Sequence, residues 1–317
     1  MKSTSSAPAK VILFGEHFVV YGGKAVLCSI NKRITAESEL VKGDKIEVSS
    51  SLGSITVPKN VDIKTVDSVF RPVVFLAQKI LGQFKSDSGI KISITSEIPA
   101  GVGLGSSSAC CVAAAGSILG LFSSPSKKEM LDLAIDAERT VFENASGADS
   151  NICVYGGIME YSKNGVARLE LKPTFKLVIV NSKVTHSTSE VVARVRKFKE
   201  RETSMFSTLC DNEAALVEEA LNALKKNDVR TLGQKMLVNQ AHLERIGVSN
   251  ETLNSMVDSV RDVAYGAKIT GAGDGGCVIA LVDGKNLDKT LGVLRSKNYE
   301  CFAADLDDAG AVVSPKP

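Results

Sequence analysis

Residues 99–109 read PAGVGLGSSSA, and this stretch decides the fold. It follows residues 90–95, IKISIT, whose alternation of apolar and polar side chains predicts a strand, and it leads into the small, apolar residues 109–121, which predict a buried helix. Glycines at every second position let the backbone approach a bulky anion, and the N-terminal end of a helix attracts negative charge. The stretch therefore predicts a phosphate-binding loop that opens a helix.

The spacing of the glycines excludes two common phosphate-binding loops. A Walker loop requires G-x-x-x-x-G-K-[ST], but no lysine follows Gly105, and a Rossmann fingerprint requires G-x-G-x-x-G, whereas this chain has G-x-G-x-G. The serines at 106–108 add hydroxyls that can cap the helix, donate to phosphate oxygens or bind magnesium. Taken alone, the loop leaves a simpler alternative open, a glycine-rich turn before a serine-capped helix.

Composition and charge restrict the class of protein. The chain has 317 residues, enough for two domains of ordinary size, and its 44% hydrophobic and 23% charged residues are typical of a globular enzyme. The formal net charge of +2 gives no basic surface for nucleic acid, and no segment is apolar and long enough to span a membrane. Because residues 1–8 contain no apolar signal core, we expect a cytosolic protein without nucleic-acid or membrane partners.

Cysteine and histidine are too scattered for a zinc site. The seven cysteines include no C-x-x-C pair, and most lie among apolar residues, which predicts buried free thiols. The three histidines, His17, His186 and His242, are widely spaced along the chain. We therefore expect no zinc.

The order of the predicted elements divides the chain near Pro173. The first part has predicted strands over 12–20, 25–40, 45–49, 54–57 and 90–95 and helices over 66–84, 109–121 and 127–142. The second part has strands over 176–181, 267–270, 277–282 and 299–303, with helices over 190–201, 206–226, 229–245, 251–263 and 287–296. Without the four helices before residue 267, the second part is a β-α-β-β-α-β split unit. We expect an α+β protein with domains at 1–172 and 173–317 and a ligand between them, because both parts carry a glycine loop.

Three glycine-centred motifs resemble, in this order, the three signatures of the GHMP kinase superfamily. They are APAKVILFGEH at 7–17, PAGVGLGSSSA at 99–109 and KITGAGDGGC at 268–277. Within the superfamily the chain is most similar to the mevalonate kinases, as seen in KVILFGEHFVVYG at 10–22, SGAD at 146–149 and NQAHL at 239–243. A galactokinase would carry an Arg-Asn pair ahead of Gly-Glu-His, and this chain lacks it. The resemblance extends over nearly the whole chain.

The resemblance implies a fold and a reaction. The fold is the two-domain GHMP kinase fold, with an N-terminal ribosomal-protein-S5-like domain and a C-terminal ferredoxin-like split β-α-β domain that carries extra helices. The reaction is the ATP- and Mg²⁺-dependent phosphorylation of the terminal hydroxyl of mevalonate to 5-phosphomevalonate, a cytoplasmic step of isoprenoid biosynthesis, and the family also suggests a homodimer. Two alternatives stay open: another GHMP kinase with an acidic substrate, such as phosphomevalonate kinase, and a catalytically inactive relative that serves as a ligand sensor.

By resemblance, four residues carry the chemistry. Asp149 corresponds to the catalytic aspartate of the family and Lys10 to the lysine that lowers the pKa of the substrate hydroxyl and pairs with phosphate. Glu138 and Ser107 correspond to the metal ligands, and Mg²⁺ needs only one or two protein oxygens. Together they supply the base, the cation and the metal that phosphoryl transfer to an alcohol requires. Simpler interpretations are an Asx-turn aspartate, a solvated strand-edge lysine and an exposed helix acid.

The resemblance also assigns residues to the two substrates. Those for ATP lie in two glycine loops and are Pro99, Gly101, Gly103, Leu104, Gly105, Ser106, Ser107, Ser108, Gly271, Ala272 and Gly273. Those for mevalonate are Glu16, His17 and Thr188. Glu16 and His17 interrupt the apolar run 11–20, where buried polar side chains are costly unless the strand ends and the chain turns into a site. Thr188 has a second interpretation, as the N-cap of a helix that begins near Glu190.

Three residues depart from the family pattern. Ala9 and His186 replace residues that are more often Gly and Arg in the family, and Asp274 is the clearest departure. Asp274 stands in the third motif where a run of four glycines is usual. A carboxylate close to the phosphates would repel them. We therefore expect the side chain of Asp274 to point away from the phosphates or towards a cation.

Overall fold

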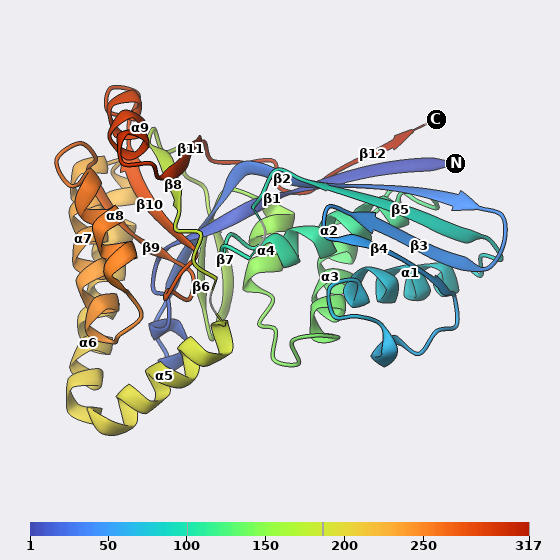
Figure 1. Cartoon of the computed structure of the whole chain (residues 1–317), viewed down its shortest axis with the longest axis horizontal. Helices are drawn as coiled ribbons and strands as arrows, with labels where there is room; N and C mark the ends of the chain where they lie inside the picture. The colour runs from blue at the N-terminus through green and yellow to red at the C-terminus, as the bar shows by residue number, and fades with distance from the viewer. Residues whose placement is uncertain (100, 186, 317) are drawn as a thin grey trace.

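The computed structural model describes residues 1–99, 101–185 and 187–316, and within them the chain forms two β-sheets (Figure 1). Ala100 of the first glycine loop and His186 lie outside the described residues. The two sheets occupy different halves of the molecule, and helices cover each of them (Figure 1). This is the α+β architecture that the order of motifs predicts.

The larger sheet contains the first seven strands and the last strand of the chain. These are β1 (Lys2–Phe14), β2 (Ala25–Val41), β3 (Lys45–Ser50), β4 (Gly53–Pro58), β5 (Gly89–Ser96), β6 (Ile158–Ser162), β7 (Gly165–Leu169) and β12 (Val312–Lys316). The order is β12-β1-β2-β5-β3-β4, with β6 paired to β2 and β7 to β6. Most neighbours are antiparallel, whereas β3 and β5 run parallel.

Four helices pack on one face of this sheet (Figure 1): α1 (Arg71–Gln83), α2 (Ser106–Leu119), α3 (Lys127–Arg139) and α4 (Ala148–Tyr155). α2 contacts β1 and β2 as well as the other three helices, so it is buried on nearly every side. Its small side chains allow this close packing, which agrees with the buried helix predicted after the first glycine loop.

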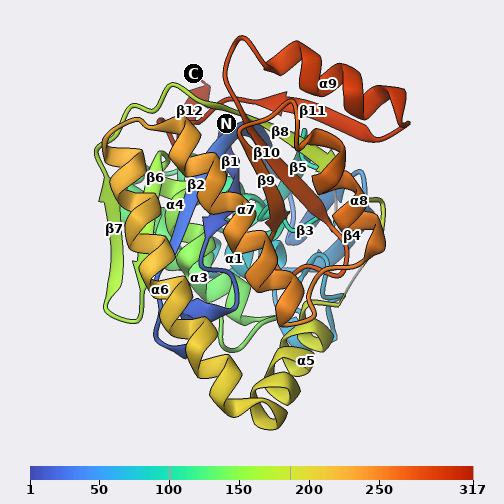
Figure 2. The ribbon, with the colours of Figure 1, turned by 90° about the vertical axis from the view of Figure 1, so that its left-hand side faces the viewer.

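The smaller sheet is wholly antiparallel and has the order β11-β8-β10-β9. Its strands are β8 (Lys176–Asn181), β9 (Gly266–Thr270), β10 (Cys277–Val282) and β11 (Glu300–Ala304). The helices of this half are α5 (Thr188–Arg201), α6 (Thr203–Lys225), α7 (Val229–Arg245), α8 (Glu251–Val260) and α9 (Leu287–Ser296), as Figure 2 shows. With α5 to α8 inserted after β8, the order matches the predicted split unit.

The first strand differs from the prediction of a strand over 12–20. β1 begins ten residues earlier, at Lys2, and ends at Phe14, while residues 18–21 form a 3-10 helix. The polar start of β1 is buried because α2 presents glycine to it: Gly116 packs against the hydroxyl of Ser5 so closely that no Cβ would fit. The serine-rich start of β1 has no apolar pattern because it packs against a helix with small side chains, so the sequence did not predict it as a strand.

Two further strand features did not follow from the sequence. The hairpin of β6 and β7 is mostly exposed in its second strand and lacks an apolar pattern there, and β12 returns from the end of the chain to the larger sheet.

The division of the chain into 1–172 and 173–317 stays a prediction. Four cysteines are buried and three are half-buried, all of them free, and no helix in the described ranges is long and apolar enough to cross a membrane.

The C-terminal end of β1 reaches the smaller sheet. The backbone N–H of Ile12 donates to the hydroxyl of Thr270 at 2.8 Å, and that hydroxyl donates to the carbonyl oxygen of Ile12 at 3.1 Å. These bonds place the loop after β1 beside the loop after β9. The candidate site lies at this junction.

Candidate active site

The first glycine loop packs on the side chain of Lys10. Gly101, Gly103 and Gly105 have φ angles of 72°, 80° and 75°, and α2 begins directly after them. A Cβ on Gly105 would lie 2.7 Å from Cγ of Lys10, so this position requires glycine for both space and backbone conformation. The backbone N–H of Lys10 donates to the carbonyl oxygen of Leu104 at 2.9 Å, which fixes the loop against β1.

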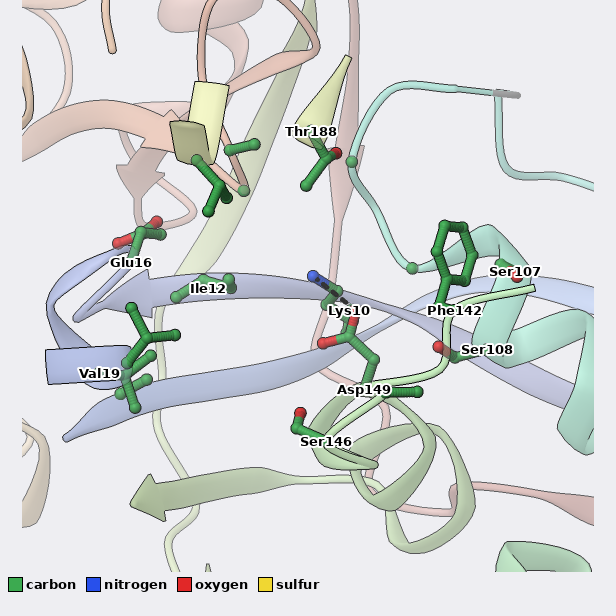
Figure 3. Close-up of a pocket in the computed structure, with 18 of the residues that line it drawn as sticks. Lys10, Ile12, Glu16, Val19, Ser107, Ser108, Phe142, Ser146, Asp149 and Thr188 are labelled. Atoms are coloured by element: carbon green, nitrogen blue, oxygen red, sulfur yellow. Dashed lines mark ion pairs between the residues drawn. The ribbon is translucent and has the colours of Figure 1, made fainter. Parts of the chain in front are cut away.

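Lys10 and Asp149 form an ion pair beside this loop (Figure 3). Nζ of Lys10 lies 3.1 Å from Oδ2 of Asp149; the lysine side chain is 6% exposed and the aspartate side chain 39%. Asp149 is in the first turn of α4, where the helix dipole stabilises a carboxylate. Lys10 is therefore no solvated strand-edge lysine, and the carboxylate beside it remains open to a ligand.

Glu138 lies beside this pair, near the C-terminal end of α3. Its carboxylate accepts hydrogen bonds from the hydroxyls of Ser108 and Ser150, the second at 2.7 Å, and its side chain is buried. Burial raises the pKa of Glu138, and the two hydroxyl donors offset part of this rise. The simpler interpretation of an exposed helix acid does not describe this residue. The serine bonded to Glu138 is Ser108, whereas Ser107 is exposed and lines the cavity.

The oxygen atoms of Glu138 and Ser107 suit a magnesium ion that also binds phosphate. Each carboxylate oxygen of Glu138 has lone-pair capacity beyond the hydrogen bond that it accepts, and Ser107 lines the same cavity. Mg²⁺ prefers such oxygens and keeps phosphate and water as its other ligands. In the part of the chain that the structure describes, no group of three or more His, Cys, Asp or Glu gathers to hold a metal. A metal here would therefore depend on the oxygens of a bound phosphate.

The third glycine loop lies beside the first. A Cβ built on Gly271 would lie 3.5 Å from the carbonyl oxygen of Gly103, so the backbones of the two loops are close neighbours. Nε2 of His17 is 2.8 Å from the carbonyl oxygen of Ala272, which fixes the loop after β1 to the third glycine loop. Burial lowers the pKa of His17, and the hydrogen bond to Ala272 offsets part of this effect.

Asp274, the clearest departure from the family pattern, faces a cation. Oδ2 of Asp274 accepts a hydrogen bond from Nη2 of Arg194 at 2.6 Å. The cavity is lined from this loop by Gly271 and Ala272, and Asp274 is not among its lining residues in the described ranges. The carboxylate therefore points away from the cavity, as expected from the repulsion between carboxylate and phosphate.

Glu16 forms a buried ion pair that the sequence analysis missed. Its carboxylate accepts from Nζ of Lys268 on β9, which also donates to the carbonyl oxygen of Ile269 at 2.5 Å, and both side chains are at most 1% exposed. The second carboxylate oxygen, Oε2, is buried without a hydrogen-bond partner in the described structure. Burial raises the pKa of Glu16 and lowers that of Lys268, while the attraction between the two acts in the opposite direction on each. The sequence held one sign of this pair, the charged residue Lys268 within the strand β9, whose sequence is GAKIT.

One cavity of about 600 Å³ brings most of the predicted site residues together. From the predicted set, it is lined by Lys10, Glu16, His17, Gly101, Gly103, Gly105, Ser106, Ser107, Ser108, Glu138, Asp149, Thr188, Gly271 and Ala272. Pro99, Leu104 and Gly273 are not among its described lining residues. Thr188 is the first residue of α5, and the N-cap is Ser187, so the capping interpretation of Thr188 was wrong by one residue.

A second cavity of about 400 Å³ adjoins the first and was not predicted. It shares Gly101, Ser106, Ser107 and Phe142 with the first cavity. Its other walls are apolar and serine side chains from β3 and the turn after it, the loop before α1, β5 and the segment after it, and α2. They include Leu52, Val69, Phe70, Ile94, Ile98, Ser50, Ser68 and Ser96. An apolar slot with a few hydroxyls suits a flat ring system.

Two family profiles match the chain. The profile described as GHMP kinases N terminal domain matches residues 69–157, and the one described as GHMP kinases C terminal matches residues 220–300. The matches cover the first glycine loop, α2 to α4, and strands β9 and β10 of the smaller sheet.

Individual proteins resemble the chain over most of its length. It is 36% identical over 307 residues to a mevalonate kinase from Pyrococcus furiosus, with 90% of each chain covered. Its structure resembles that of the Methanococcus jannaschii mevalonate kinase with a TM-score of 0.86 and 27% identity, covering 96% of this chain and 98% of that one. It also resembles the L. major mevalonate kinase in complex with R-mevalonate, with a TM-score of 0.80, 27% identity and 96% coverage of both chains.

Proposed function

Because the chain belongs to the GHMP kinase family, whose members use ATP, we propose that it acts as a mevalonate kinase and transfers the γ-phosphoryl group of ATP to the terminal hydroxyl of mevalonate. One observation carries the reaction type: Lys10 and Asp149 pair at 3.1 Å within a cavity walled by two glycine loops. The substrate follows from similarity to relatives named mevalonate kinases at 36% and 34% identity.

Asp149 accepts the proton of the substrate hydroxyl in this mechanism. The hydroxyl oxygen bonds to the γ-phosphorus while the bond from that phosphorus to the bridging oxygen of ADP breaks, so one phosphoryl group moves and one proton stays on Asp149. Lys10 neutralises charge on the transferring group, and backbone N–H groups at the start of α2 hold the phosphates. The placement of a cation and an open carboxylate side by side supports this division of roles.

The two cavities suggest where each substrate binds. The smaller cavity, with its apolar walls and serine hydroxyls, would hold the adenosine, and the shared residues Ser106 and Ser107 would meet the phosphates. Mevalonate would then lie on the other side of Lys10, between Glu16, His17 and Thr188. In Figure 3, Glu16 and the two serines Ser107 and Ser108 lie on opposite sides of Lys10, in keeping with this arrangement.

The charge of the larger cavity favours mevalonate over its phosphorylated product. Lys10 is the one lysine or arginine among the described residues that line this cavity. A phosphomevalonate kinase must bind the phosphoryl group of its substrate as well as the phosphates of ATP, which requires further cations. Retention of Lys10, Glu138 and Asp149 together also argues against an inactive ligand sensor, since a sensor has no need of the base.

A coupled ADP-release assay tests the proposed function. The purified protein is offered mevalonate, phosphomevalonate, galactose and homoserine in turn, each with ATP and Mg²⁺. We expect turnover with mevalonate to exceed that with each of the others by at least about a hundredfold, about 2.7 kcal/mol of discrimination. Faster turnover of one of the other three compounds would show that mevalonate is not the preferred substrate. No turnover of any of the four would favour the ligand sensor.

We also propose that Glu138 and Ser107 hold Mg²⁺, which when bound neutralises charge on the phosphate oxygens. Glu138→Gln should then raise the Mg²⁺ concentration for half-maximal activity at least about fivefold, because an amide oxygen is a weaker ligand than a carboxylate. A metal titration at saturating mevalonate measures this. Glu143→Gln, an exposed acid in the loop after α3, is the matched control. An unchanged titration in Glu138→Gln would remove Glu138 from the metal site.

We further propose that the protein is a cytosolic homodimer, on the basis of the family resemblance. Light scattering of the purified protein measures its mass, to be compared with the 33.5 kDa of one chain. A monomeric mass at assay concentration would refute the dimer, and recovery of the native protein in a membrane fraction of its cells would refute the location.

A further inference from the structure

Helix α5 forms one wall of the larger cavity but is weakly anchored in the core. Thr188, Val192 and Val195 line the cavity, whereas only Val191 and Val195 of its 14 residues are buried. Figure 2 shows α5 at the edge of the molecule, away from the centre of the smaller sheet. A helix with so little buried apolar surface needs other contacts to hold one orientation.

Arg194 supplies such a contact. Its Nη2 donates to Oδ2 of Asp274 at 2.6 Å, and its Nη1 approaches the carbonyl oxygen of Gly247 at 3.4 Å. The backbone N–H of Asp274 donates to the carbonyl oxygen of Val248 at 2.7 Å, so the arginine reaches two segments that are already bonded to each other. One side chain of α5 is thereby tied to the third glycine loop and to the turn after α7.

The third glycine loop is a firm support for this contact. It packs through Gly271 on the first glycine loop and accepts a hydrogen bond from His17. Asp274 has a φ of 61°, a left-handed conformation that asparagine, aspartate and glycine adopt most readily. An aspartate here offers a charge without the strain that a longer acid would suffer in that conformation.

We propose that Arg194 and Asp274 are positioning residues that hold α5 against the mevalonate site. Neither side chain is among the described residues that line the cavity, so they act through Thr188 and Val192. The proposal rests on the proposed function, because it assigns the wall formed by α5 to mevalonate. It also gives a physical role to the residue that interrupts the glycine run.

Loss of the pair is expected to weaken mevalonate binding selectively. In Asp274→Asn and in Arg194→Gln, the KM for mevalonate should rise three- to fivefold, while kcat and the KM for ATP change less than twofold. A fivefold rise corresponds to about 1 kcal/mol, the upper range for a pair whose side chains are 45% and 36% exposed. The KM for mevalonate of the double variant should be no higher than that of either single variant, because each substitution removes the same interaction.

Matched variants separate positioning from general damage. Arg194→Lys should keep the KM within twofold of wild type, and Lys197→Gln, an exposed cation on the same helix, should leave all constants unchanged. At about 1 M salt, where the Debye length is about 3 Å, the difference in the KM for mevalonate between wild type and Asp274→Asn should become smaller.

Three results would overturn the proposal: an unchanged KM for mevalonate in both single variants, a rise confined to ATP, or additive effects in the double variant. Wild-type protein that does not phosphorylate mevalonate would instead refute the proposed function.

Discussion

Asp149→Asn is expected to lower kcat for mevalonate phosphorylation at least about a hundredfold while ATP still binds. Asparagine keeps the size of the side chain, but it cannot accept the hydroxyl proton, and it presents a neutral amide to Lys10. General-base catalysis of this kind contributes roughly 10² to 10⁴ to the rate. Steady-state turnover gives kcat, and calorimetry with a non-hydrolysable ATP analogue gives the affinity, which should stay within about threefold.

A remote aspartate provides the control for this variant. Asp132→Asn alters an exposed carboxylate on α3 that pairs with Lys128, so it should leave kcat unchanged. Turnover of Asp149→Asn within threefold of wild type would remove Asp149 from the mechanism. Equal losses of kcat and of nucleotide affinity would mean that Asp149 serves binding rather than proton transfer.

The sequence was informative where a chemical constraint acts over a short stretch. The first glycine loop needs positive φ angles at Gly101, Gly103 and Gly105, and contact with Lys10 excludes a Cβ at the last of them. Such requirements leave a local pattern that can be recognised without the fold. For the same reason the sequence placed the turn before Asp149 and the helix that carries Glu138 in the correct order.

Features that depend on distant partners were not predictable. The smaller cavity is walled by β3, β5 and α2, which meet only after folding. Arg194 is 80 residues from Asp274, and Lys268 is 252 residues from Glu16, so the sequence could not identify the partner of either acid. The start of β1 was missed because its serines are buried against glycines of α2 rather than against apolar side chains.

Lys268→Met is expected to destabilise the folded protein by about 3–5 kcal/mol at neutral pH. Methionine fits the buried stem, but it leaves the carboxylate of Glu16 without the partner of one oxygen, and the other oxygen already has none in the described structure. Removing one partner of a buried ion pair costs this much because the remaining charge is uncompensated. Urea denaturation measures the free energy of unfolding. Lys128→Met, which breaks the exposed pair with Asp132, should cost less than about 1 kcal/mol.

The pH dependence of this loss identifies its cause. Burial raises the pKa of Glu16 and Lys268 lowers it, so the folded-state pKa of Glu16 rises further when the lysine is absent. Glu16 in the variant then stays protonated in the folded state above the unfolded pKa of about 4.3, and stability falls as pH rises from there to the folded pKa. The difference in stability between wild type and Lys268→Met should therefore be larger at about pH 8 than at about pH 5.

The double variant E16Q/K268M separates the buried charge from the loss of packing. Glutamine has no charge to compensate, so the free energy of unfolding should recover by at least half of the loss in Lys268→Met. Because we propose that Glu16, which lines the cavity, contacts mevalonate, the double variant should bind mevalonate more weakly than wild type even where its stability recovers. This result would separate the stabilising role of the pair from the proposed role of Glu16 in binding. A double variant as unstable as Lys268→Met, with no dependence on pH, would show that the aliphatic stem of Lys268 rather than its charge holds the two sheets together at this point.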